Sequence, residues 1–462
     1  MRIDCTAEDS VSCATAEGAG RIPAEYASGA PVGPWVGHNS APPTEDLLER
    51  VFASANMQRA WKQVKRNKGA AGVDGRSIGE AHVFLRAHWP ALRQALLAET
   101  YQPFPVLRVS LPKPGGGVRH LGIPTVVDRL IQQAICQVLT PIFDPGFSEF
   151  SYGFRPGRSA HDAVHQALAY QQDGCQWVVD LDLKQFFDDV DHDILMSRIG
   201  RKVTDKRLKR LINAYLTAGI LCPDGLRPSV KGTPQGGPLS PLLSNILLDD
   251  LDKELERRGH SFCRYADDCQ VYVRTRRAGD RVLHSITQYV EGLKLKVNHA
   301  KSAVARPWQR TFLGFTFIKV FGSMRLHLPV KTLHRFRSRV KQLLHVGRGR
   351  NVARFIREQL NLVLRGWMQY FAPGASKRIL TTLDFWLRRR LRCVIWRQWK
   401  RPRTRFNRLV GLGCSSEQAV TALNRRGPWR NSALPILTHA LSPTWFRALD
   451  LYGFLDHLLP RD

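Results

Sequence analysis

The order of apolar and polar residues gives the middle of the chain a mixed pattern. Between Pro103 and Phe317, short alternating segments such as VLRVSLP, QWVVDLDL and FCRYADDCQVYV predict strands. Between them lie helical segments such as RLIQQAICQVLTPIF and PLLSNILLDDLDKEL. Strands and helices mixed without regular alternation predict an α+β fold and not a doubly wound sheet.

The pattern differs before this region. From Glu45 to about Leu97, apolar residues recur at helical spacing, interrupted by the turn-rich GAAGVDG, which predicts a small helical region. Residues 1–43 lack periodicity and are rich in Ala, Gly, Ser, Pro and acidic residues. We expect them to form a flexible acidic leader that is not a nucleic-acid surface.

From Lys331 onward the periodicity predicts helices only. Two apolar stripes at helical spacing indicate amphipathic helices that pack on each other. The first stripe contains Val352, Phe355, Ile356, Val363, Trp367 and Tyr370, and the second contains Leu383, Trp386, Leu387, Leu391, Val394 and Ile395.

Basic residues are concentrated in this helical region. The chain has 69 Lys and Arg against 39 Asp and Glu, a net charge of +30, which favours a polyanionic partner. Residues 331–410 hold 22 basic and two acidic residues. Arg388, Arg389 and Arg392 fall outside the apolar stripe, so we expect them to face a phosphate backbone and to bind RNA. The alternative is a merely solvated surface.

Several functional classes are disfavoured. The nine cysteines form no CxxC pair, which indicates reduced thiols and neither a zinc site nor a disulfide framework. The sequence contains no run of about 18 apolar residues, so it predicts no membrane-spanning helix. Acidic residues near the start argue against a secretory signal. We therefore expect a cytoplasmic protein, associated with the nucleoid through its charge.

The segment RYADDCQVYV predicts a strand, a tight turn and a second strand, with Asp267 and Asp268 at the turn. Adjacent carboxylates repel each other unless a cation is bound beside them. An exposed turn without function is the alternative, because Asp is common in turns.

A second carboxylate cluster strengthens the metal-site interpretation. In QWVVDLDLKQFFDDV, strand alternation places Asp180 and Asp182 on one face of a strand. Three carboxylates from two neighbouring strands are the device that holds two Mg²⁺ ions about 4 Å apart for nucleotidyl transfer. Hard oxygen ligands favour Mg²⁺ over zinc.

The chain resembles the reverse transcriptases encoded by bacterial group II introns, in order from about Asn56 to about Arg401. The resemblance rests on NKGAAGVDG, LPKPGGGVRHLGIPTVVDRLIQQA, SEFSYGFRPGRSAHDAV, VVDLDLKQFFDDVDH, GTPQGGPLSPLLSNILLDDLD, RYADD, VNHAKS and FLGF. It implies a right-hand polymerase. Residues 44–100 would extend the fingers, 101–320 would form fingers and palm with an antiparallel sheet, and 331–450 an all-helical maturase domain that serves as thumb.

The resemblance also implies roles for individual residues. Asp182, Asp267 and Asp268 would bind the metal ions, together with the backbone carbonyl of Leu183, and Asp180 is the alternative for the first position. The residues expected at the incoming nucleotide are Lys113, Arg119, Phe187, Gln235 and Lys301, with Phe187 excluding the sugar 2′-hydroxyl. The residues expected at primer or template are Arg155, Arg158 and Gly314.

The implied partners are group II intron RNA, an RNA template, a DNA primer or target, and deoxynucleoside triphosphates. Relatives often end in a zinc-stabilised endonuclease with paired cysteines and histidines, which we expect to be absent because only Cys414, His439 and His457 follow Arg401. Two alternatives stay open: a splicing-only RNA-binding factor, and a host-adopted reverse transcriptase in defence or repair. Phe187 disfavours an RNA polymerase.

Overall fold

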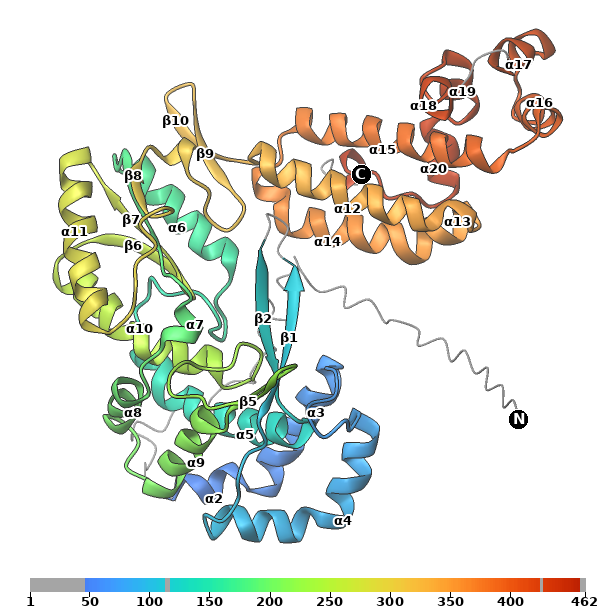
Figure 1. Ribbon diagram of the computed structural model, residues 1–462. Coiled ribbons are helices and arrows are strands. Elements are labelled where there is room, and N and C mark those ends of the chain that lie inside the picture. The colour runs from blue at the N-terminus through green and yellow to red at the C-terminus, as the bar shows by residue number, and fades with distance from the viewer. Residues whose placement is uncertain (1–45, 113–116, 424–426, 458–462) are drawn as a thin grey trace, which may run out of the picture.

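A computed structural model describes residues 46–112, 117–423 and 427–457 (Figure 1). The expected leader, residues 1–43, and the expected nucleotide ligand Lys113 lie outside the described residues. The described part contains both helices and strands, which confirms the predicted α+β class.

Helices dominate the first part of the described chain. They are α2 (Leu47–Val51), α3 (Ser54–Asn67), α4 (Ile78–Leu97) and α5 (Val126–Phe143). A capping box starts α4, because the Ser77 hydroxyl accepts from the Glu80 amide while the Glu80 carboxylate accepts from the Ser77 amide. The apolar faces of these helices pack into one core with the helices that follow the first strands.

Two four-stranded sheets follow. In sheet 1 the order is β2-β1-β4-β5, and in sheet 2 it is β6-β7-β3-β8. Sheet 1 consists of β1 (Val106–Pro112), β2 (Val118–Ile123), β4 (Ile220–Cys222) and β5 (Gly225–Arg227). Sheet 2 consists of β3 (Trp177–Asp182), β6 (Ser261–Tyr265), β7 (Asp268–Val273) and β8 (Ala303–Ala305).

Sheet 2 is antiparallel throughout and carries the predicted carboxylates. Its central strands β3 and β7 pair with Asp182 opposite Asp268 and Asp180 opposite Gln270. The helices between and around the strands of the two sheets are α6 (Ala160–Gln172), α7 (Phe186–Asp189), α8 (His192–Gly200), α9 (Lys206–Thr217), α10 (Ser240–Arg257) and α11 (Arg276–Gly292). Helices α6 and α11 contact its strands, so the sheet is largely enclosed and its strands are mostly apolar.

A hairpin of β9 (Thr316–Val320) and β10 (Ser323–His327) leads to the C-terminal helical part, residues 330–457. All of its described elements are helical. The longer ones are α12 (Val330–Val346), α14 (Asn361–Phe371), α15 (Lys377–Gln398), α16 (Pro402–Gly411) and α17 (Ser416–Leu423). The shorter ones include α13 (Val352–Phe355), the π-helical η4 (Ile356–Leu360), α18 (Pro428–Asn431), α19 (Pro435–Ala440) and α20 (Pro443–Ala448).

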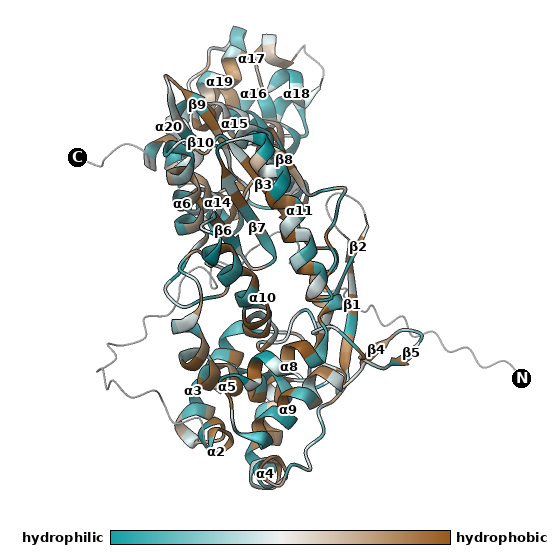
Figure 2. Cartoon of the chain, turned by 90° about the vertical axis from the view of Figure 1, so that its left-hand side faces the viewer, coloured by the Kyte–Doolittle hydropathy of each residue, from teal (hydrophilic) through white to brown (hydrophobic). Residues whose placement is uncertain are grey.

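Figure 2 shows helices α2–α5, α8 and α9 at one end of the molecule, and sheet 2 with the C-terminal helices toward the other end. In Figure 1, helices α12 and α14 lie beside sheet 2. Sheet 2 and the C-terminal helices share a hydrophobic cluster, in which Phe312 and Phe315 pack near Trp367, Tyr370 and Phe371. The C-terminal helices are therefore packed directly against the sheet region.

The prediction that Arg392 faces outward is wrong. Its side chain is buried, and its Nε donates to the Leu441 carbonyl oxygen at 3.1 Å. Helix α15 is covered on a second side by the segment around α18, where Pro428 accepts a hydrogen bond from Cys393. A single apolar stripe cannot reveal this second packing layer.

Within the described residues, no helix is both long and apolar enough to cross a membrane.

Candidate active site

The predicted carboxylates meet at one end of sheet 2. Asp182 ends β3, and Asp268 begins β7 directly opposite it, while Asp267 precedes Asp268 in the turn that joins β6 to β7. Ala266 in this turn has a left-handed backbone with φ of 58°. Such a conformation is strained for a residue other than glycine, so the surrounding contacts must hold it.

The side chains of Asp267 and Asp268 are partly buried, and their surroundings disfavour the charged form of each carboxyl group. Burial raises the pKa of Asp267, and the nearby Asp182 carboxylate raises it further. The pKa of Asp268 lies well above its usual range, because of burial and then the repulsion of Asp180, Asp267 and Asp182. Neither side chain accepts a hydrogen bond from another described residue. A bound cation would relieve this repulsion.

Asp182 has partners of its own. Asn298 Nδ2 donates to one carboxylate oxygen at 3.0 Å, and Lys301 Nζ lies 3.4 Å from the other. The Ser302 hydroxyl accepts from the Asp182 backbone amide at 3.0 Å. The turn at 298–302 therefore fixes the end of β3, and Lys301 supplies a positive charge at the carboxylate cluster.

The Asp180 carboxylate interacts with a different pair of side chains. It accepts from Gln270 Nε2 at 3.1 Å and lies 3.5 Å from Arg310 Nη1. Arg310 also donates to the Lys301 carbonyl oxygen at 3.1 Å. Both carboxylates thus have an amide donor and a cation beside them, but Asp182 lies directly opposite Asp268 and its side chain is more exposed, 39% against 19% for Asp180.

The donor set fits hard divalent cations, although the side chains do not converge on one point. Among the described residues, no three His, Cys, Asp or Glu side chains already form a metal-binding cluster. Asp182 is turned toward Asn298 and Lys301, whereas Asp267 and Asp268 lack polar side-chain partners in the described part of the chain. Three carboxylates on adjacent paired strands are the chemistry that such cations require.

Two of the expected nucleotide ligands contact each other. Arg119 on β2 donates through Nε to Gln235 Oε1 at 3.2 Å. The backbone beside them is close-packed, because the Gly122 amide donates to the Gln235 carbonyl oxygen at 2.8 Å. Gly236 has φ of 133°, and a Cβ there would lie 2.5 Å from the Gly122 oxygen, so this loop requires glycine.

Phe187 and Leu183 lie on the same connection after β3. Phe187 is half-buried against Phe186, with ring centroids 5.2 Å apart, and its carbonyl oxygen accepts from the Thr233 amide at 2.7 Å. Leu183 is buried and forms an isolated bridge with Val297. The backbone at both residues is held by neighbouring segments.

Gly314 lies where the sheet region meets the C-terminal helices. Its φ is 86°, and a Cβ would approach the Phe371 ring to 3.0 Å. The Thr332 hydroxyl donates to its carbonyl oxygen at 2.9 Å. Glycine is needed there for backbone conformation and for close packing.

The prediction that the Arg155 side chain contacts the template is wrong. The guanidinium is buried, donates to Asp144 Oδ1 at 2.7 Å, and donates to the Ser148 and Ser151 carbonyl oxygens. With a further bond from Nη2 to the Asp144 carbonyl oxygen at 2.9 Å, four of its five N–H groups are used, so Arg155 supports the loop. Arg158 is half-buried and donates to the Glu149 carbonyl oxygen at 2.5 Å.

The two other predicted RNA-binding arginines are partly exposed on α15. The Arg389 guanidinium lies 3.8 Å from the centroid of the Trp429 ring, and Arg388 lies 5.4 Å from that of Phe385. Stacked guanidinium groups can keep edge N–H groups available to an oxyanion. Arg389 keeps fewer of them, because its Nη2 donates to the Trp429 carbonyl oxygen at 3.5 Å and its Nε is enclosed.

Sequence reasoning missed Arg264, which stands two residues before Ala266 and is fully buried. It pairs with Asp252 on α10 and also donates to the Ala266 carbonyl oxygen at 2.8 Å. The signal was a charged residue in an otherwise apolar strand, which calls for a buried partner.

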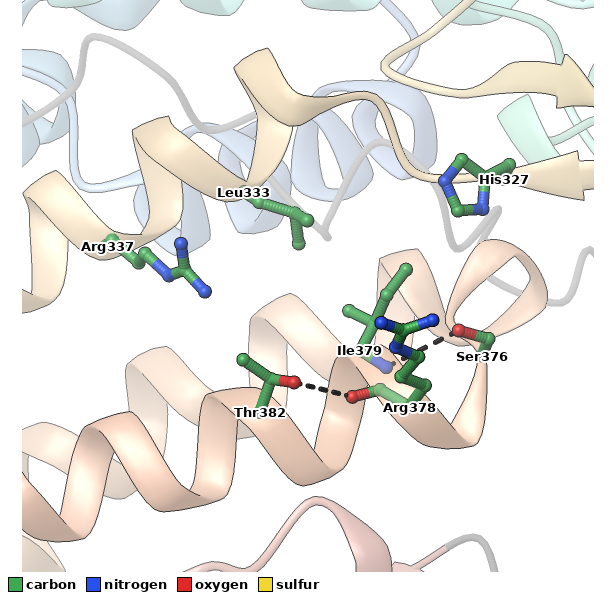
Figure 3. A pocket seen from close by; sticks show the side chains of 7 residues that line it. All are labelled: His327, Leu333, Arg337, Ser376, Arg378, Ile379 and Thr382. Atoms are coloured by element: carbon green, nitrogen blue, oxygen red, sulfur yellow. Dashed lines mark hydrogen bonds between the residues drawn. The ribbon is translucent and has the colours of Figure 1, made fainter.

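A pocket of about 300 Å³ lies apart from the carboxylates, between β10, α12 and the start of α15 (Figure 3). Leu333 and Ile379 line it together with Arg337 and Arg378, and Ser376 caps the first turn of α15. None of the predicted site residues that the structure describes lines this pocket.

Two segments of the chain match known protein families. Residues 111–317 match the family described as reverse transcriptase (RNA-dependent DNA polymerase), and residues 333–410 match the group II intron, maturase-specific domain. The two matches coincide with the sheet region and with the basic helices.

Individual relatives agree. Protein YkfC of Escherichia coli is 31% identical over 358 residues, which cover 67% of this chain and 94% of that protein. The group II intron-encoded protein LtrA of Lactococcus lactis is 40% identical over 195 residues, 42% of this chain. The match spans only 32% of LtrA. A solved partial Cas6-RT-Cas1--Cas2 complex aligns over 54% of this chain and 42% of that chain, with 24% identity and a TM-score of 0.35.

Proposed function

Because the chain belongs to the group II intron-encoded reverse transcriptases that carry a maturase domain, we propose that it copies RNA into DNA at Asp182, Asp267 and Asp268. Its C-terminal helices would bind intron RNA and assist splicing and intron mobility. The observation that carries the proposal is the pairing of Asp182 with Asp268 on adjacent strands, next to Asp267 in the connecting turn.

The three aspartates, with the Leu183 carbonyl, would hold two Mg²⁺ ions. Reverse transcriptase domains use divalent metal ions, which lower the pKa of the attacking 3′-hydroxyl and stabilise the leaving pyrophosphate. The chain's own contribution is a rigid strand pair that fixes the carboxylate spacing. Lys301 beside Asp182 would reduce the repulsion among the carboxylates and the incoming phosphates.

The incoming deoxynucleotide would bind between β2 and the Gln235 loop. Arg119 suits the triphosphate because guanidinium groups bind phosphate oxygens with two parallel hydrogen bonds. Its contact with Gln235 would orient it before the nucleotide arrives. The half-buried ring of Phe187 would exclude a sugar with a 2′-hydroxyl.

The parts of the molecule would then serve as a right hand. Sheet 2 would be the palm, sheet 1 and the preceding helices the fingers, and residues 330–457 the thumb. Arg158 would contact the template, Gly314 would border the primer end, and Arg388 and Arg389 would contact RNA phosphates. The net charge of +30 supports nucleic acid as the partner of all these surfaces.

Primer extension tests this proposal. The native chain is expected to extend a DNA primer on an RNA template with Mg²⁺ and deoxynucleoside triphosphates. A folded chain that binds group II intron RNA but extends no primer would contradict the polymerase and leave a splicing factor.

A further inference from the structure

Arg264 on β6 is fully buried and uses every N–H of its guanidinium. Nε and Nη2 donate to the two carboxylate oxygens of Asp252 at 2.7 and 2.5 Å. Nη1 donates to Asn245 Oδ1 at 3.0 Å and to the Ala266 carbonyl oxygen at 2.8 Å, and Nη2 also donates to the Ser151 hydroxyl at 2.8 Å. A guanidinium has five N–H groups, so none is left unsatisfied.

These bonds connect the turn of Ala266 and Asp267 between β6 and β7, the catalytic turn, to helix α10 and to the segment before α6. Asp252 and Asn245 belong to α10, and Ser151 belongs to the segment before α6. Within the turn, Arg264 contacts the carbonyl of Ala266, the residue with the strained backbone. That carbonyl shares one planar peptide unit with the amide of Asp267, so fixing one fixes the other.

The opposite side of the turn is enclosed as well. A Cβ at Gly153 would lie 2.3 Å from the Ala266 amide nitrogen, so the backbone there approaches as closely as glycine permits. Asn245 Nδ2 donates to the Gly153 carbonyl oxygen at 2.8 Å. Asn245 therefore links both sides, because its oxygen accepts from Arg264.

We propose that Arg264 is a positioning residue, which acts with Asp252 and Asn245 to hold the Ala266–Asp267 peptide so that the Asp267 carboxylate can bind metal. This inference rests on the proposed polymerase function. Arg264 has no access to substrate, since its side chain is enclosed, and it acts through the turn.

The test is Arg264→Lys in the full chain. A lysine keeps the positive charge beside Asp252 but has three donors in place of five, so the hydrogen bonds to Asn245, Ala266 and Ser151 cannot all persist. We expect the dissociation constant for Mn²⁺, measured from free Mn²⁺ by electron paramagnetic resonance, to rise about tenfold. We expect kcat for primer extension to fall about 10- to 100-fold, because small misplacements of reacting groups have effects of this size.

The matched control is Arg198→Lys. Arg198 pairs at 2.6 Å with Asp250, which lies on α10 like Asp252, and within the described residues its guanidinium makes no hydrogen bond to the catalytic turn. The control should leave Mn²⁺ affinity, kcat and the KM for deoxynucleotides within about twofold of native. If Arg264→Lys fails to fold, Asn245→Ala replaces it and should shift Mn²⁺ affinity in the same direction.

Unchanged Mn²⁺ affinity and kcat in folded Arg264→Lys, even with a lower melting temperature, would overturn the proposal and leave a purely structural ion pair. A native chain that binds Mn²⁺ but extends no primer would contradict the polymerase function instead. In that case the Mn²⁺ shift alone decides the role of Arg264.

Discussion

The aspartates of the candidate site differ in whether other side chains compensate their charge. Asp182 accepts from Asn298 and lies beside Lys301, whereas Asp267 and Asp268 receive no hydrogen bond from the other described residues. The fold therefore keeps two carboxylates in an unfavourable environment. Such strain is typical of a site that is completed by a ligand.

The raised carboxyl pKa values predict how metal-free stability depends on pH. In the unfolded chain these groups titrate near 4, and in the fold burial raises the pKa of Asp267 and Asp268. The folded state thus gains stability from their protonation, fully below about pH 4, and loses it as pH rises through the raised values. Metal-free native protein should melt about 2 °C lower at pH 8 than Asp268→Asn.

Thermal melting at pH 5 and pH 8, with and without Mg²⁺, checks this expectation. Mg²⁺ should stabilise the native chain at pH 8 and have a smaller effect on Asp268→Asn. A native chain whose stability does not differ from that of Asp268→Asn at either pH would argue against the electrostatic strain.

Phe187 supplies a second prediction for a single residue. Phe187→Ala should raise the relative kcat/KM for ribonucleotides over deoxynucleotides by about 10- to 100-fold, because a ring-sized space opens for the 2′-hydroxyl. Single-nucleotide incorporation on an RNA template measures the ratio. Phe321→Ala is the control, since it removes the same ring from an exposed position in the turn between β9 and β10 and should not alter sugar selection.

The sequence predicted the positions of individual site residues only where a local pattern, such as strand alternation or a turn motif, indicated them. Strand alternation and the YADD turn located Asp182, Asp267 and Asp268 on neighbouring strands, as the register shows. The template contact predicted for Arg155 is wrong, because only tertiary contacts reveal that Asp144 and backbone carbonyl oxygens bind its buried guanidinium. The same limit hid Arg264.

At the scale of elements, the strands and long helices followed their periodicity, and departures occurred where local geometry changed. The π-helical turn η4 adds a residue per turn and rotates the apolar face. The buried apolar residues after Ile356 in η4 and α14 are Leu360, Leu364 and Met368, whereas the predicted Val363, Trp367 and Tyr370 are only half-buried.

Helix α15 gives a prediction that separates surface from core arginines. Arg388→Ala with Arg389→Ala should weaken RNA binding and lower the slope of log affinity against log salt by about one for each phosphate that is no longer neutralised. Arg392→Ala should lower the melting temperature instead, because removal of a buried guanidinium leaves its Leu441 acceptor unpaired. RNA titrations at several salt concentrations distinguish the two. Equal salt slopes in native and double mutant would reject α15 as a phosphate-binding surface.

At the scale of the whole molecule, the sheet region and the C-terminal helices share apolar packing. Phe315 contacts the rings of Tyr370 and Phe371, and His161 Nε2 lies 2.7 Å from the Tyr370 carbonyl oxygen. The predicted domain boundaries remain predictions. The shared cluster means that the two parts stabilise each other.

Truncation tests this dependence. A chain ending at Pro329 exposes the aromatic cluster that Trp367, Tyr370 and Phe371 cover, so it should aggregate or melt several degrees below the full chain. Size-exclusion chromatography and thermal melting measure the effect. A monodisperse fragment with native melting temperature would show that the C-terminal helices are dispensable for the stability of the sheet region.

The central claim is that three aspartates at one end of sheet 2 catalyse RNA-templated DNA synthesis. The most direct measurement compares primer extension by the native chain, by Asp267→Ala, and by Asp173→Ala, which removes an exposed turn aspartate elsewhere. Extension should be retained in the native chain and Asp173→Ala and fall at least about a hundredfold in Asp267→Ala, the order of magnitude for loss of one group that stabilises charge in the transition state. Extension that survives in folded Asp267→Ala would contradict the account.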